Sequence, residues 1–401
     1  MPVSKLSNQP LSPLDGRYQA AVVELGEHLS EAGLNRARIH VEIEWLIQLA
    51  NRQVLSNSRT LDLTEQAALR AVVANFSDAD VAKLAATEAV TRHDVKAVEY
   101  FIREQLAIIR RTDLSELAHF ACTSEDINNL SYALTVKAAV NDVWVPRAKT
   151  LIAKLAGLAT SYAEVAMLSR THGQPATPTT VGKELAVFVH RLNRQLARIE
   201  AADYLGKFSG ATGTFSAHVV AVPSVDWQTE ARTLVEGLGL SFNPLTTQIE
   251  SHDWQAELYT AIAHFNRVLH NLCTDIWTYI SQNYFKQIPQ AGATGSSTMP
   301  HKVNPIRFEN AEANLELSNA ILDSLAATLV TSRLQRDLTD SSSQRNIGVG
   351  FGHSLLAIDN VIKGLGEIEL NRPVLDADLS ENWEVLGEAI QTVIRAEVAA
   401  G

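Results

Sequence analysis

The chain has 401 residues, of which 46% are hydrophobic and 20% are charged, and its formal net charge is −11. This balance excludes a disordered chain, which would be poor in apolar residues and rich in charged ones. The acidic balance also argues against a general nucleic-acid binder, because that function needs a basic face that displaces counterions. It still permits a local cationic patch that binds an anionic small molecule.

Cysteine usage and hydropathy favour a cytoplasmic protein. Cys122 and Cys273 lie far apart in apolar, helical contexts, so neither a disulfide framework nor a zinc site is expected. No run of about 18 apolar residues could span a bilayer, and residues 1–6 lack the apolar core of a signal peptide. The sequence also lacks phosphate-binding and dinucleotide glycine motifs, zincin histidine pairs and Cys-x-x-Cys pairs. We therefore expect no cofactor, no metal and no membrane contact.

Long helices are the elements that the sequence predicts most clearly. The first in chain order starts near Glu125 and runs to about residue 160, with a kink at Pro146. The next covers about 179–204, after two threonine cap candidates. Residues 208–222 are glycine-rich, and we expect them to form a strand-like insertion between helices.

The segment 253–285 has the most regular helical pattern. Its apolar side chains recur every three or four residues, at Trp254, Leu258, Ile262, Phe265, Leu269, Leu272 and Ile276. A helix of this span is roughly 50 Å long, which is more than a small core requires. A second apolar stripe consists of Ala311, Leu315, Leu322, Leu325 and Leu329. These patterns predict an all-α fold, an elongated bundle of long helices that favours oligomerisation.

Two breaks divide the chain into three predicted domains. They fall near 110–122 and near 371–374, where Asn371-Arg372-Pro373 is expected to interrupt a helix. We expect an N-terminal helical domain over 1–115 and a central long-helix domain over 116–370. Residues 371–401 would begin a C-terminal helical domain.

Two polar clusters precede predicted helices in the first half of the chain. In the run Arg92-His93-Asp94, Asp94 is the expected N-cap, and His93 has no capping task, which makes it a candidate functional residue. Further on, Thr123 or Ser124 caps a helix whose first turn holds two acids. Capping alone explains this second cluster. The alternative is that its hydroxyls and free amides bind an anion.

Two later clusters carry candidate acid–base residues. His172 lies in a loop with a glycine and two prolines, so it is either a surface histidine or a general acid or base with a fixed orientation. The loop 292–305 is rich in small and hydroxyl residues and contains Lys302. Asn304 is its predicted N-cap and Pro305 the first residue of the next helix. This loop is either a linker or a mobile lid over an anion.

Arginines gather near the end of the central segment. Arg333, Arg336 and Arg345 would form a clamp for a phosphate or a carboxylate in this otherwise acidic protein. The alternative is a solvated face on which nearby aspartates pair with the arginines.

The run GSSTMPHKVNP at 295–305 resembles the signature of the fumarase/aspartase superfamily. Within that superfamily, the chain resembles the adenylosuccinate lyase family, of the type common in bacteria. The supporting segments are SPLDGRY at 12–18, HDVKAVEY at 93–100, TSED at 123–126, THGQPA at 171–176, TTQIE at 246–250 and RDLTDS at 336–341. The resemblance extends from about residue 10 to about residue 395.

This resemblance implies an all-α homotetramer built around a central twenty-helix bundle, with composite active sites drawn from three subunits. It implies a small-molecule substrate, a succinylated purine nucleotide. Two reactions of purine biosynthesis are implied, and both are β-eliminations that release fumarate. One starts from adenylosuccinate and gives AMP; the other starts from succinyl-aminoimidazole-carboxamide ribotide. The resemblance makes Ser296 the general base and His172 the general acid.

The resemblance assigns the other candidate residues to substrate binding. His93 would lie at the phosphate, with Arg92 and Asp94 beside it. The group that would hold the phosphate and ribose consists of Arg17, Tyr18, Arg333, Arg336, Ser341 and Arg345. The group that would hold the succinyl carboxylates and neighbouring atoms consists of Thr123, Ser124, Gln248, Ser297, Lys302 and Asn304.

Two alternatives and one departure from the family pattern accompany this interpretation. A sister lyase acting on argininosuccinate would share the signature loop, but its substrate has no phosphate for His93 and Arg336. A non-catalytic bundle protein would not need both Ser296 and His172. Family chains continue past residues 382–386 with a further helical domain, whereas this chain ends at Gly401. We therefore expect a truncated C-terminal domain.

Overall fold

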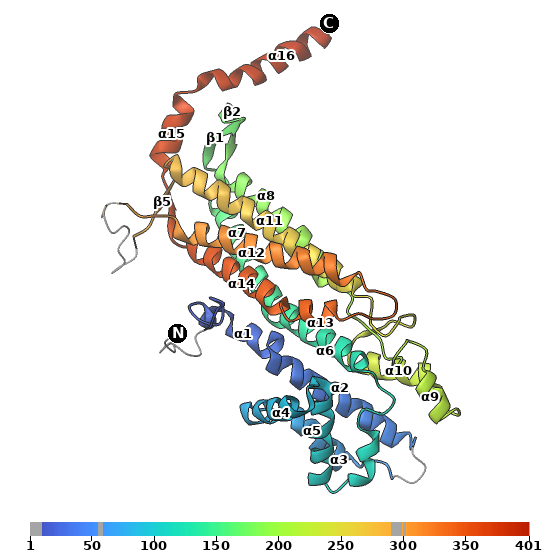
Figure 1. The fold of residues 1–401 in the computed structure, drawn as a ribbon. Helices are drawn as coiled ribbons and strands as arrows, with labels where there is room; N and C mark the ends of the chain where they lie inside the picture. The colour runs from blue at the N-terminus through green and yellow to red at the C-terminus, as the bar shows by residue number, and fades with distance from the viewer. Residues whose placement is uncertain (1–9, 55–58, 290–298, 300–301, 401) are drawn as a thin grey trace. The chain divides into compact units, whose positions relative to one another are not determined.

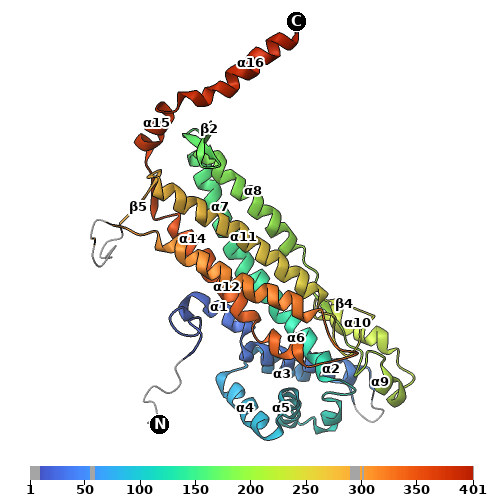
Figure 2. The ribbon, with the colours of Figure 1, turned by 45° about the horizontal axis from the view of Figure 1, so that its top comes forward.

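The computed structural model describes residues 10–54, 59–289, 299 and 302–400, and these are mainly helical (Figures 1 and 2). The chain divides into two compact units. The first unit consists of Met1–Trp144, Ala201–Thr260 and Ile321–Phe351, and the second of Val145–Glu200, Ala261–Ala320 and Gly352–Gly401. Among the described helices, α11 (Asp253–Ser281), α12 (Ile306–Leu329) and α14 (Ile347–Gly364) contribute residues to both units. The predicted helical fold class is confirmed, and the three-domain division stays a prediction.

In the first unit, α2 (Glu31–Asn51) packs against α6 (Ser124–Ala138). Helix α5 (Asp94–Ile108) packs against both α2 and α4 (Asp78–Thr91). The helices of this unit are α1 (Gln19–Leu29), α2 (Glu31–Asn51), α3 (Leu63–Ala74), α4 (Asp78–Thr91), α5 (Asp94–Ile108), α6 (Ser124–Ala138), α9 (Ser216–Ala221), α10 (Trp227–Gly237) and α13 (Thr339–Gln344). A 3₁₀-helix, η1 (Thr112–Leu117), and a π-helical stretch, η2 (Ala139–Trp144), complete the helical elements described in this unit. The short strands β3 (Leu205–Gly206) and β4 (Ser241–Phe242) pair in parallel.

The core of the first unit is built around Trp45 on α2. The Trp45 side chain is fully buried, and its ring centroid lies 4.4 Å from that of Phe208 and 6.2 Å from that of Trp227. Its Nε1–H donates to the backbone oxygen of Phe120 at 3.2 Å. These contacts therefore connect α2 to α10, to Phe120 just before α6 and to Phe208 just after β3.

In the second unit, α7 and α8 lie side by side (Figures 1 and 2). Besides its parts of the long helices, this unit contains α7 (Val145–Ser161), α8 (Val181–Glu200), α15 (Arg372–Ser380), the 3₁₀-helix η3 (Trp383–Leu386) and α16 (Gly387–Ala400). Strands β1 (Ala166–Thr171) and β2 (Gln174–Thr180) form an antiparallel hairpin, and β5 (Phe285–Gln287) pairs antiparallel with β6 (Ile368–Leu370).

Both predicted apolar stripes are buried. Every residue of the 254–276 stripe and of the 311–329 stripe has at most 4% of its surface exposed. The helix predicted over 253–285 ends at Ser281, and the one predicted over 179–204 is α8. Within the described part of the chain, no helix combines the length and hydropathy that crossing a bilayer requires.

The helix predicted from Glu125 to about residue 160 is confirmed in its extent, because α6, η2 and α7 follow one another without a gap from Ser124 to Ser161, and the π-helical stretch η2 ends just before Pro146. Three other local predictions are wrong. Residues 208–222 contain α9 and no strand. Asn371-Arg372-Pro373 starts α15, because the preceding helix α14 already ends at Gly364. Cys122 lies in the coil before α6, whereas Cys273 is buried in α11; both are free thiols.

Candidate active site

Asp94 joins two arginines from different parts of the first unit. Arg38 on α2, whose side chain is 2% exposed, donates from Nη2 to Asp94 Oδ2 at 2.8 Å. Arg345, at the end of α13, approaches the same oxygen at 3.3 Å and also donates to Glu31 at 2.6 Å. The start of α5 is therefore held between α2 and the arginine-rich segment, residues 333–345.

A second ion-pair group is centred on Arg336. Arg336 lies 3.2 Å from Glu125 on α6 and 2.8 Å from Asp340 on α13. Asp340 in turn lies 3.3 Å from Nε2 of the buried His252. Asn128 connects the two groups, because it accepts from Arg38 at 2.9 Å and donates to Glu125 at 2.8 Å.

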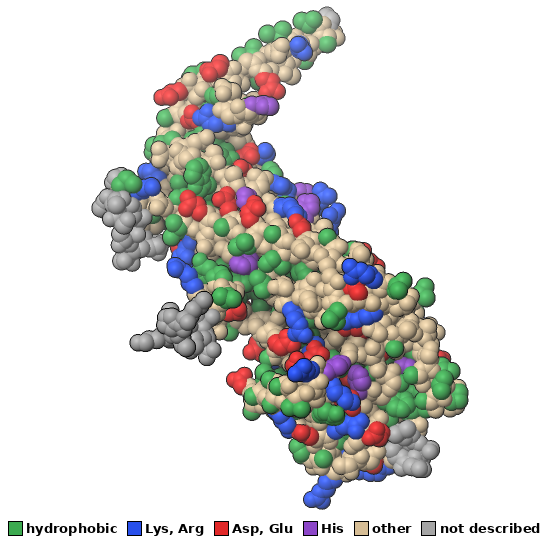
Figure 3. Space-filling model, in the orientation of Figure 1, with side chains coloured by type: hydrophobic (Ala, Val, Ile, Leu, Met, Phe, Trp, Pro, Cys, Tyr) green, Lys and Arg blue, Asp and Glu red, His purple; other side chains and the backbone are tan. Residues whose placement is uncertain are grey.

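These contacts form one continuous polar chain, which we call the arginine network. Its members, in order, are Arg345, Asp94, Arg38, Asn128, Glu125, Arg336, Asp340 and His252. Figure 3 shows exposed Lys, Arg, Asp, Glu and His side chains lying next to one another on the face that it draws, whereas most members of the arginine network are buried. The network brings the predicted residues Asp94, Arg336 and Arg345 together within one unit.

The two aspartates of the arginine network are held in the charged form. Burial acts to raise the pKa of Asp94, but Arg38, the backbone N–H of Val95 and Arg345 outweigh it, so its pKa lies below the ordinary value. Burial likewise acts to raise the pKa of Asp340, and the contacts with His252 and Arg336 lower it by more. Both carboxylates are therefore negative at neutral pH and fix the positions of their arginines.

The start of α5 differs from its prediction. His93 is the N-cap, and its Nδ1 accepts from the backbone N–H of Lys96 at 3.3 Å. Asp94, the expected cap, is the first residue of the helix, and its Oδ1 accepts from Val95 N–H at 2.8 Å. His93 therefore has a capping task, and 53% of its side chain is still exposed to solvent. Arg92 precedes it with a left-handed φ of 53°, a conformation that is uncommon for a non-glycine residue.

The start of α6 brings together Thr123 and Ser124. Thr123 is the N-cap, and its backbone N–H donates to Asp126 Oδ2 at 2.9 Å. Ser124 is the first residue of the helix and is partly exposed. Gln248, on a separate segment of the same unit, donates from Nε2 to the backbone oxygen of Ala211 at 2.8 Å. Capping thus occurs as predicted, and it leaves the two hydroxyl side chains partly accessible.

The N-terminal motif lies at a pocket that Arg345 also lines. This pocket has a volume of about 370 Å³, and its lining includes Ser12, Asp15, Glu31 and Arg345. Arg17 follows directly in the same motif, and its guanidinium carbon lies 5.9 Å from the ring centroid of Tyr18. The structure therefore places the segment 12–18 and the arginine-rich segment next to the same cavity.

Arg333 and Ser341, in the segment 333–345, are not members of the arginine network. Arg333 pairs with Asp337 at 3.2 Å and keeps 82% of its side chain exposed. The backbone N–H of Ser341 donates to Asp340 at 2.7 Å. Pairing between arginines and local aspartates, the alternative to a clamp, is therefore present, and Arg333 remains open to solvent.

His172 lies at the tip of the β1–β2 hairpin in the second unit. Thr171 pairs with Gln174, so His172 and Gly173 are the two turn residues, with φ angles of 53° and 76°. Positive φ at both positions is typical of the type I′ turn that suits a two-residue hairpin. The predicted tight loop is thus a hairpin that presents an exposed histidine.

The hairpin is anchored to α15. Arg170 donates from Nη2 to Asp378 Oδ2 at 2.6 Å, and the Tyr284 hydroxyl donates to the same carboxylate. Burial acts to lower the pKa of Arg170, but its bonds with Tyr284 and Asp378 raise it overall. The strand that leads to His172 is therefore held by a charged pair two residues before the turn.

The signature loop is described only in part. Ser296 and Ser297 lie outside the described residues. Lys302 is exposed and its backbone N–H donates to the Met299 oxygen at 3.0 Å, and Asn304 is partly buried. Helix α12 begins at Ile306, so Pro305 precedes it and the predicted helix start was one residue early.

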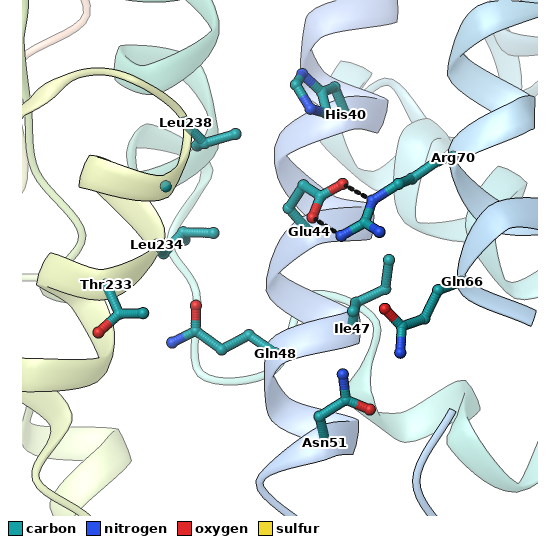
Figure 4. Close-up of a pocket in the computed structure, with 11 residues that line it drawn as sticks. His40, Glu44, Ile47, Gln48, Asn51, Gln66, Arg70, Thr233, Leu234 and Leu238 are labelled. Carbon is teal, nitrogen blue, oxygen red and sulfur yellow. Dashed lines mark hydrogen bonds and ion pairs between the residues drawn. The ribbon is translucent and has the colours of Figure 1, made fainter. Parts of the chain in front are cut away.

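Another pocket has none of the predicted residues in its lining. It has a volume of about 490 Å³ and lies between α2, α3 and α10 (Figure 4). Figure 4 shows the guanidinium of Arg70 against the carboxylate of Glu44, with two hydrogen bonds of 2.7 and 2.8 Å. The charged groups on this side of the pocket, Arg70 and Glu44, are therefore already paired with each other. Within the described ranges, no three His, Cys, Asp or Glu side chains are arranged to bind a metal ion.

Sequence reasoning missed five of the eight members of the arginine network. The members not predicted are Arg38, Asn128, Glu125, Asp340 and His252. A signal for Arg38 was present, because it lies at helical spacing from Leu34, Trp45 and Leu49, which are all buried. A charged residue within an apolar helical stripe is expensive to bury unless it is paired, so it points to a specific partner.

Two family profiles together match nearly the whole chain. Residues 16–319 match the family described as Lyase, and residues 332–400 match the family described as Adenylosuccinate lyase C-terminal. Adenylosuccinate lyases from Escherichia coli (strain K12) and Haemophilus influenzae are 49% and 48% identical to the chain over 386 residues. These alignments cover 96% of this chain and 85% of each relative.

Solved structures show the same fold at low sequence identity. A fumarate lyase from Mesorhizobium sp. BNC1 superposes with a TM-score of 0.75 at 18% identity, over 92% of this chain and 81% of that one. The 3-carboxy-cis,cis-muconate lactonizing enzyme from Pseudomonas putida superposes with a TM-score of 0.73 at 20% identity, over 94% of this chain and 83% of that one. The protein is therefore a lyase with the mainly helical fold of the fumarate lyases.

The sequence matches narrow this class further. The chain belongs to the adenylosuccinate lyase family. The resemblance that the signature at 295–305 indicated is thereby confirmed.

Proposed function

We propose that the chain releases fumarate from adenylosuccinate, giving AMP, and from succinyl-aminoimidazole-carboxamide ribotide. The observation that carries the proposal is the identity of 48–49% with curated adenylosuccinate lyases over 96% of the chain. The arginine network supports it, because the nucleotide substrate carries a phosphate and arginine binds phosphate through charge-assisted hydrogen bonds.

The chemistry sets the requirements of the site. A weakly acidic proton leaves the carbon beside a carboxylate, and the charge that develops spreads into that carboxylate as a dianion. The departing nitrogen must then receive a proton. A base, an acid and fixed positive groups are therefore needed.

We assign the base to Ser296 and the acid to His172. A serine hydroxyl is a poor base at its ordinary pKa and must act as an alkoxide. Lys302 and the amides at the start of α12 are the groups of this segment that would favour the charged form. His172 suits the acid because the hairpin turn holds its backbone in one conformation and its side chain is exposed.

The binding residues divide by charge and by position. His93, Arg92, Asp94, Arg17, Tyr18, Arg333, Arg336, Ser341 and Arg345 would hold the phosphate and ribose. Thr123, Ser124, Gln248, Ser297, Lys302 and Asn304 would hold the succinyl carboxylates. The partial exposure of His93 and Arg345, at 53% and 41% of their side chains, supports a role in ligand contact.

The proposed assembly is a homotetramer with composite sites. Two observations support it. The candidate residues are divided between the two units, and long helices carry exposed apolar side chains, such as Leu317 at 51% and Trp277 at 43%. No membrane or nucleic-acid partner is proposed, and we place the protein in the cytoplasm.

A fumarate-release assay tests the function. Purified chain is mixed with adenylosuccinate, and the conversion to AMP is followed by ultraviolet absorbance. The matched control is argininosuccinate, which carries the same succinyl group without a phosphate and should not react. Turnover of argininosuccinate in place of adenylosuccinate would contradict the proposal.

A further inference from the structure

Asp126 lies at the meeting point of the start of α6 and the loop 207–215. Its side chain and that of Lys207 are both fully buried, and Lys207 Nζ lies 2.7 Å from Asp126 Oδ1. Backbone N–H groups complete the shell: Ser209 N is 2.9 Å from Oδ1, and Gly210 N and Thr123 N are 3.1 and 2.9 Å from Oδ2. One carboxylate therefore joins two segments that are far apart in the sequence.

Asn129 adds a second connection between the same segments. It accepts from the backbone N–H of Lys207 at 2.8 Å, and its amide donates to the backbone oxygen of Lys207 at 2.9 Å. Residue 207 is thus fixed through its main chain by Asn129 and through its side chain by Asp126. The register of the loop against α6 is set at this point.

The loop then reaches Gln248. Its Ala211 oxygen accepts from Gln248 Nε2 at 2.8 Å. Gly213, at φ +76°, lies so close to the neighbouring chain that a Cβ there would be 2.2 Å from the Thr246 oxygen and 2.7 Å from the Thr247 oxygen. The loop 207–215 therefore contacts the segment that contains Gln248, and Asp126 holds the beginning of the same loop.

Stability alone does not explain a buried ion pair of this kind. Removing two charges from water is unfavourable, and well-packed apolar residues of similar volume often give equal or greater stability. A charged carboxylate is, however, the strongest available acceptor for several converging N–H groups. Such a buried pair can hold the surrounding backbone N–H groups in one fixed arrangement.

We propose that the buried Asp126–Lys207 pair positions the succinyl-binding side chains, by setting Thr123 and Ser124 at the start of α6 against Gln248. The inference rests on the proposed function, which assigns these three residues to the succinyl carboxylates. Asp126 and Lys207 are positioning residues, because both are fully buried and act through the backbone they hold.

Three variants test the proposal: Asp126→Asn, Lys207→Met and the double variant that carries both changes. For each we measure kcat, KM for adenylosuccinate, the inhibition constants of fumarate and of AMP, and the melting temperature. The single variants leave one buried charge without a partner, so both should melt at lower temperature. The double variant removes both charges and should recover most of that loss.

Recovery of stability should not restore binding. In the double variant we expect KM for adenylosuccinate and the inhibition constant of fumarate to stay raised, on the order of ten- to a hundredfold, because displaced groups lose alignment. The inhibition constant of AMP should change less than about threefold, since the phosphate residues belong to other contacts. Gly213→Ala displaces the same loop without touching the ion pair and should reproduce the loss of fumarate affinity.

A matched control separates positioning from folding. Arg111 is a buried arginine of the same unit that pairs with Glu65 at 3.1 Å and with Asp113 at 2.8 Å, and none of these is a candidate site residue. Arg111→Met should lower the melting temperature and leave KM and fumarate inhibition unchanged. If Arg111→Met raised both constants as the Asp126 variants do, the effect would be one of general destabilisation and the inference would be wrong.

The outcomes for function and for positioning are distinct. A wild-type chain that neither releases nor binds fumarate would overturn the proposed function and this inference with it. An active wild type, together with a stable double variant and a Gly213→Ala variant that keep wild-type KM and fumarate inhibition, would overturn the positioning role alone.

Discussion

Arg336 and Arg345 are each paired with carboxylates before any ligand arrives. Arg336 contacts Asp340 and Glu125, and Arg345 contacts Glu31 and Asp94. Pairing holds each guanidinium in place, which reduces the entropy that ligand binding would otherwise remove. A phosphate must therefore compete with the carboxylates that already pair with these arginines. A doubly charged ligand group should bind better than a weakly charged one.

Removal of a phosphate contact should affect nucleotide binding selectively. We expect Arg336→Ala and His93→Ala to weaken AMP binding at least tenfold and fumarate binding by less than about twofold, because a hydrogen bond to a charged group contributes about 1.5–3 kcal/mol. Inhibition constants of both products measure this. Arg232→Ala is the control, because Arg232 forms an exposed pair with Glu236 in the same unit. Equal weakening of both ligands would mean that Arg336 and His93 serve folding.

His218 is a buried histidine whose protonation would destabilise the fold. It is fully buried among the rings of Trp45, Phe208, Phe215 and Trp227, with centroids 6.5, 6.4, 5.5 and 4.9 Å away. Neither ring nitrogen has a hydrogen-bond partner among the described residues. Burial lowers the pKa of His218, with Asp126 opposing and Lys207 assisting the shift. The neutral ring is therefore the folded form.

The lowered pKa of His218 makes the folded state less stable at acidic pH. The pKa of His218 in the unfolded chain is about 6.5, and the folded value is lower. The unfolded state therefore binds more protons below about pH 6.5, and stability falls as the pH drops through the folded pKa. Urea unfolding of wild type and His218→Phe, measured from pH 7.5 to 5, should show a steeper loss for wild type. Parallel curves would contradict the prediction.

At the scale of elements, the β1–β2 hairpin links the proposed acid to α15. Asp378→Asn keeps the shape of the side chain but removes the charge that pairs with Arg170. We expect kcat to fall roughly tenfold as His172 loses its fixed position, while KM changes less than twofold. The matched control is Asp359→Asn, which removes a charged partner of Arg147 in the same unit. A normal kcat in Asp378→Asn would show that the hairpin keeps its position without α15.

The long helices could be predicted because one physical signal dominates them. Apolar residues at spacings of three and four located α11 and α12, and all members of both stripes are buried. The β1–β2 hairpin could not be predicted in this way. Its strands are short and contain Pro175 and Pro178, which a two-stranded sheet tolerates only at free edges. Its turn residue His172 looks like any loop histidine until the pairing of Thr171 with Gln174 is known.

Sequence motifs predicted part of the candidate site, and the remaining members of the arginine network were found from their hydrogen bonds and ion pairs in the structure. Residues such as His93 and Arg336 stood out because they lie in short polar runs between helices. Arg38 and Asn128 lie within helices, and their roles depend on partners 56 and 90 residues away in the sequence. Such long-range contacts have no local signature, so the arginine network emerges only from the fold.

At the scale of the whole molecule, buried polar contacts between helices give the bundle a defined register. Asn266 on α11 donates to Ser318 on α12 at 3.0 Å and accepts from Ser354 on α14 at 2.8 Å, and all three are fully buried. His353 pairs with Asn314 at 2.8 Å. A satisfied buried network of this kind favours one alignment of neighbouring helices over others.

Assembly from several chains gives the last prediction. If the base Ser296 and the acid His172 of one site come from different subunits, Ser296→Ala and His172→Ala should each lose several orders of magnitude in turnover, because each serves a proton transfer made only in the transition state. Mixing the two inactive variants with subunit exchange should then restore activity. A working site takes its serine from one variant and its histidine from the other.

Random mixing sets the size of this recovery. At equal amounts each functional side chain is present with a chance of one half, so the ceiling is about a quarter of wild-type activity. Native mass spectrometry of the mixture, with one variant isotopically labelled, shows whether mixed oligomers have formed. Each variant alone, taken through the same exchange, is the control. Proven mixing without recovered activity would place Ser296 and His172 of each site on the same chain, since only then does every site keep one defective residue.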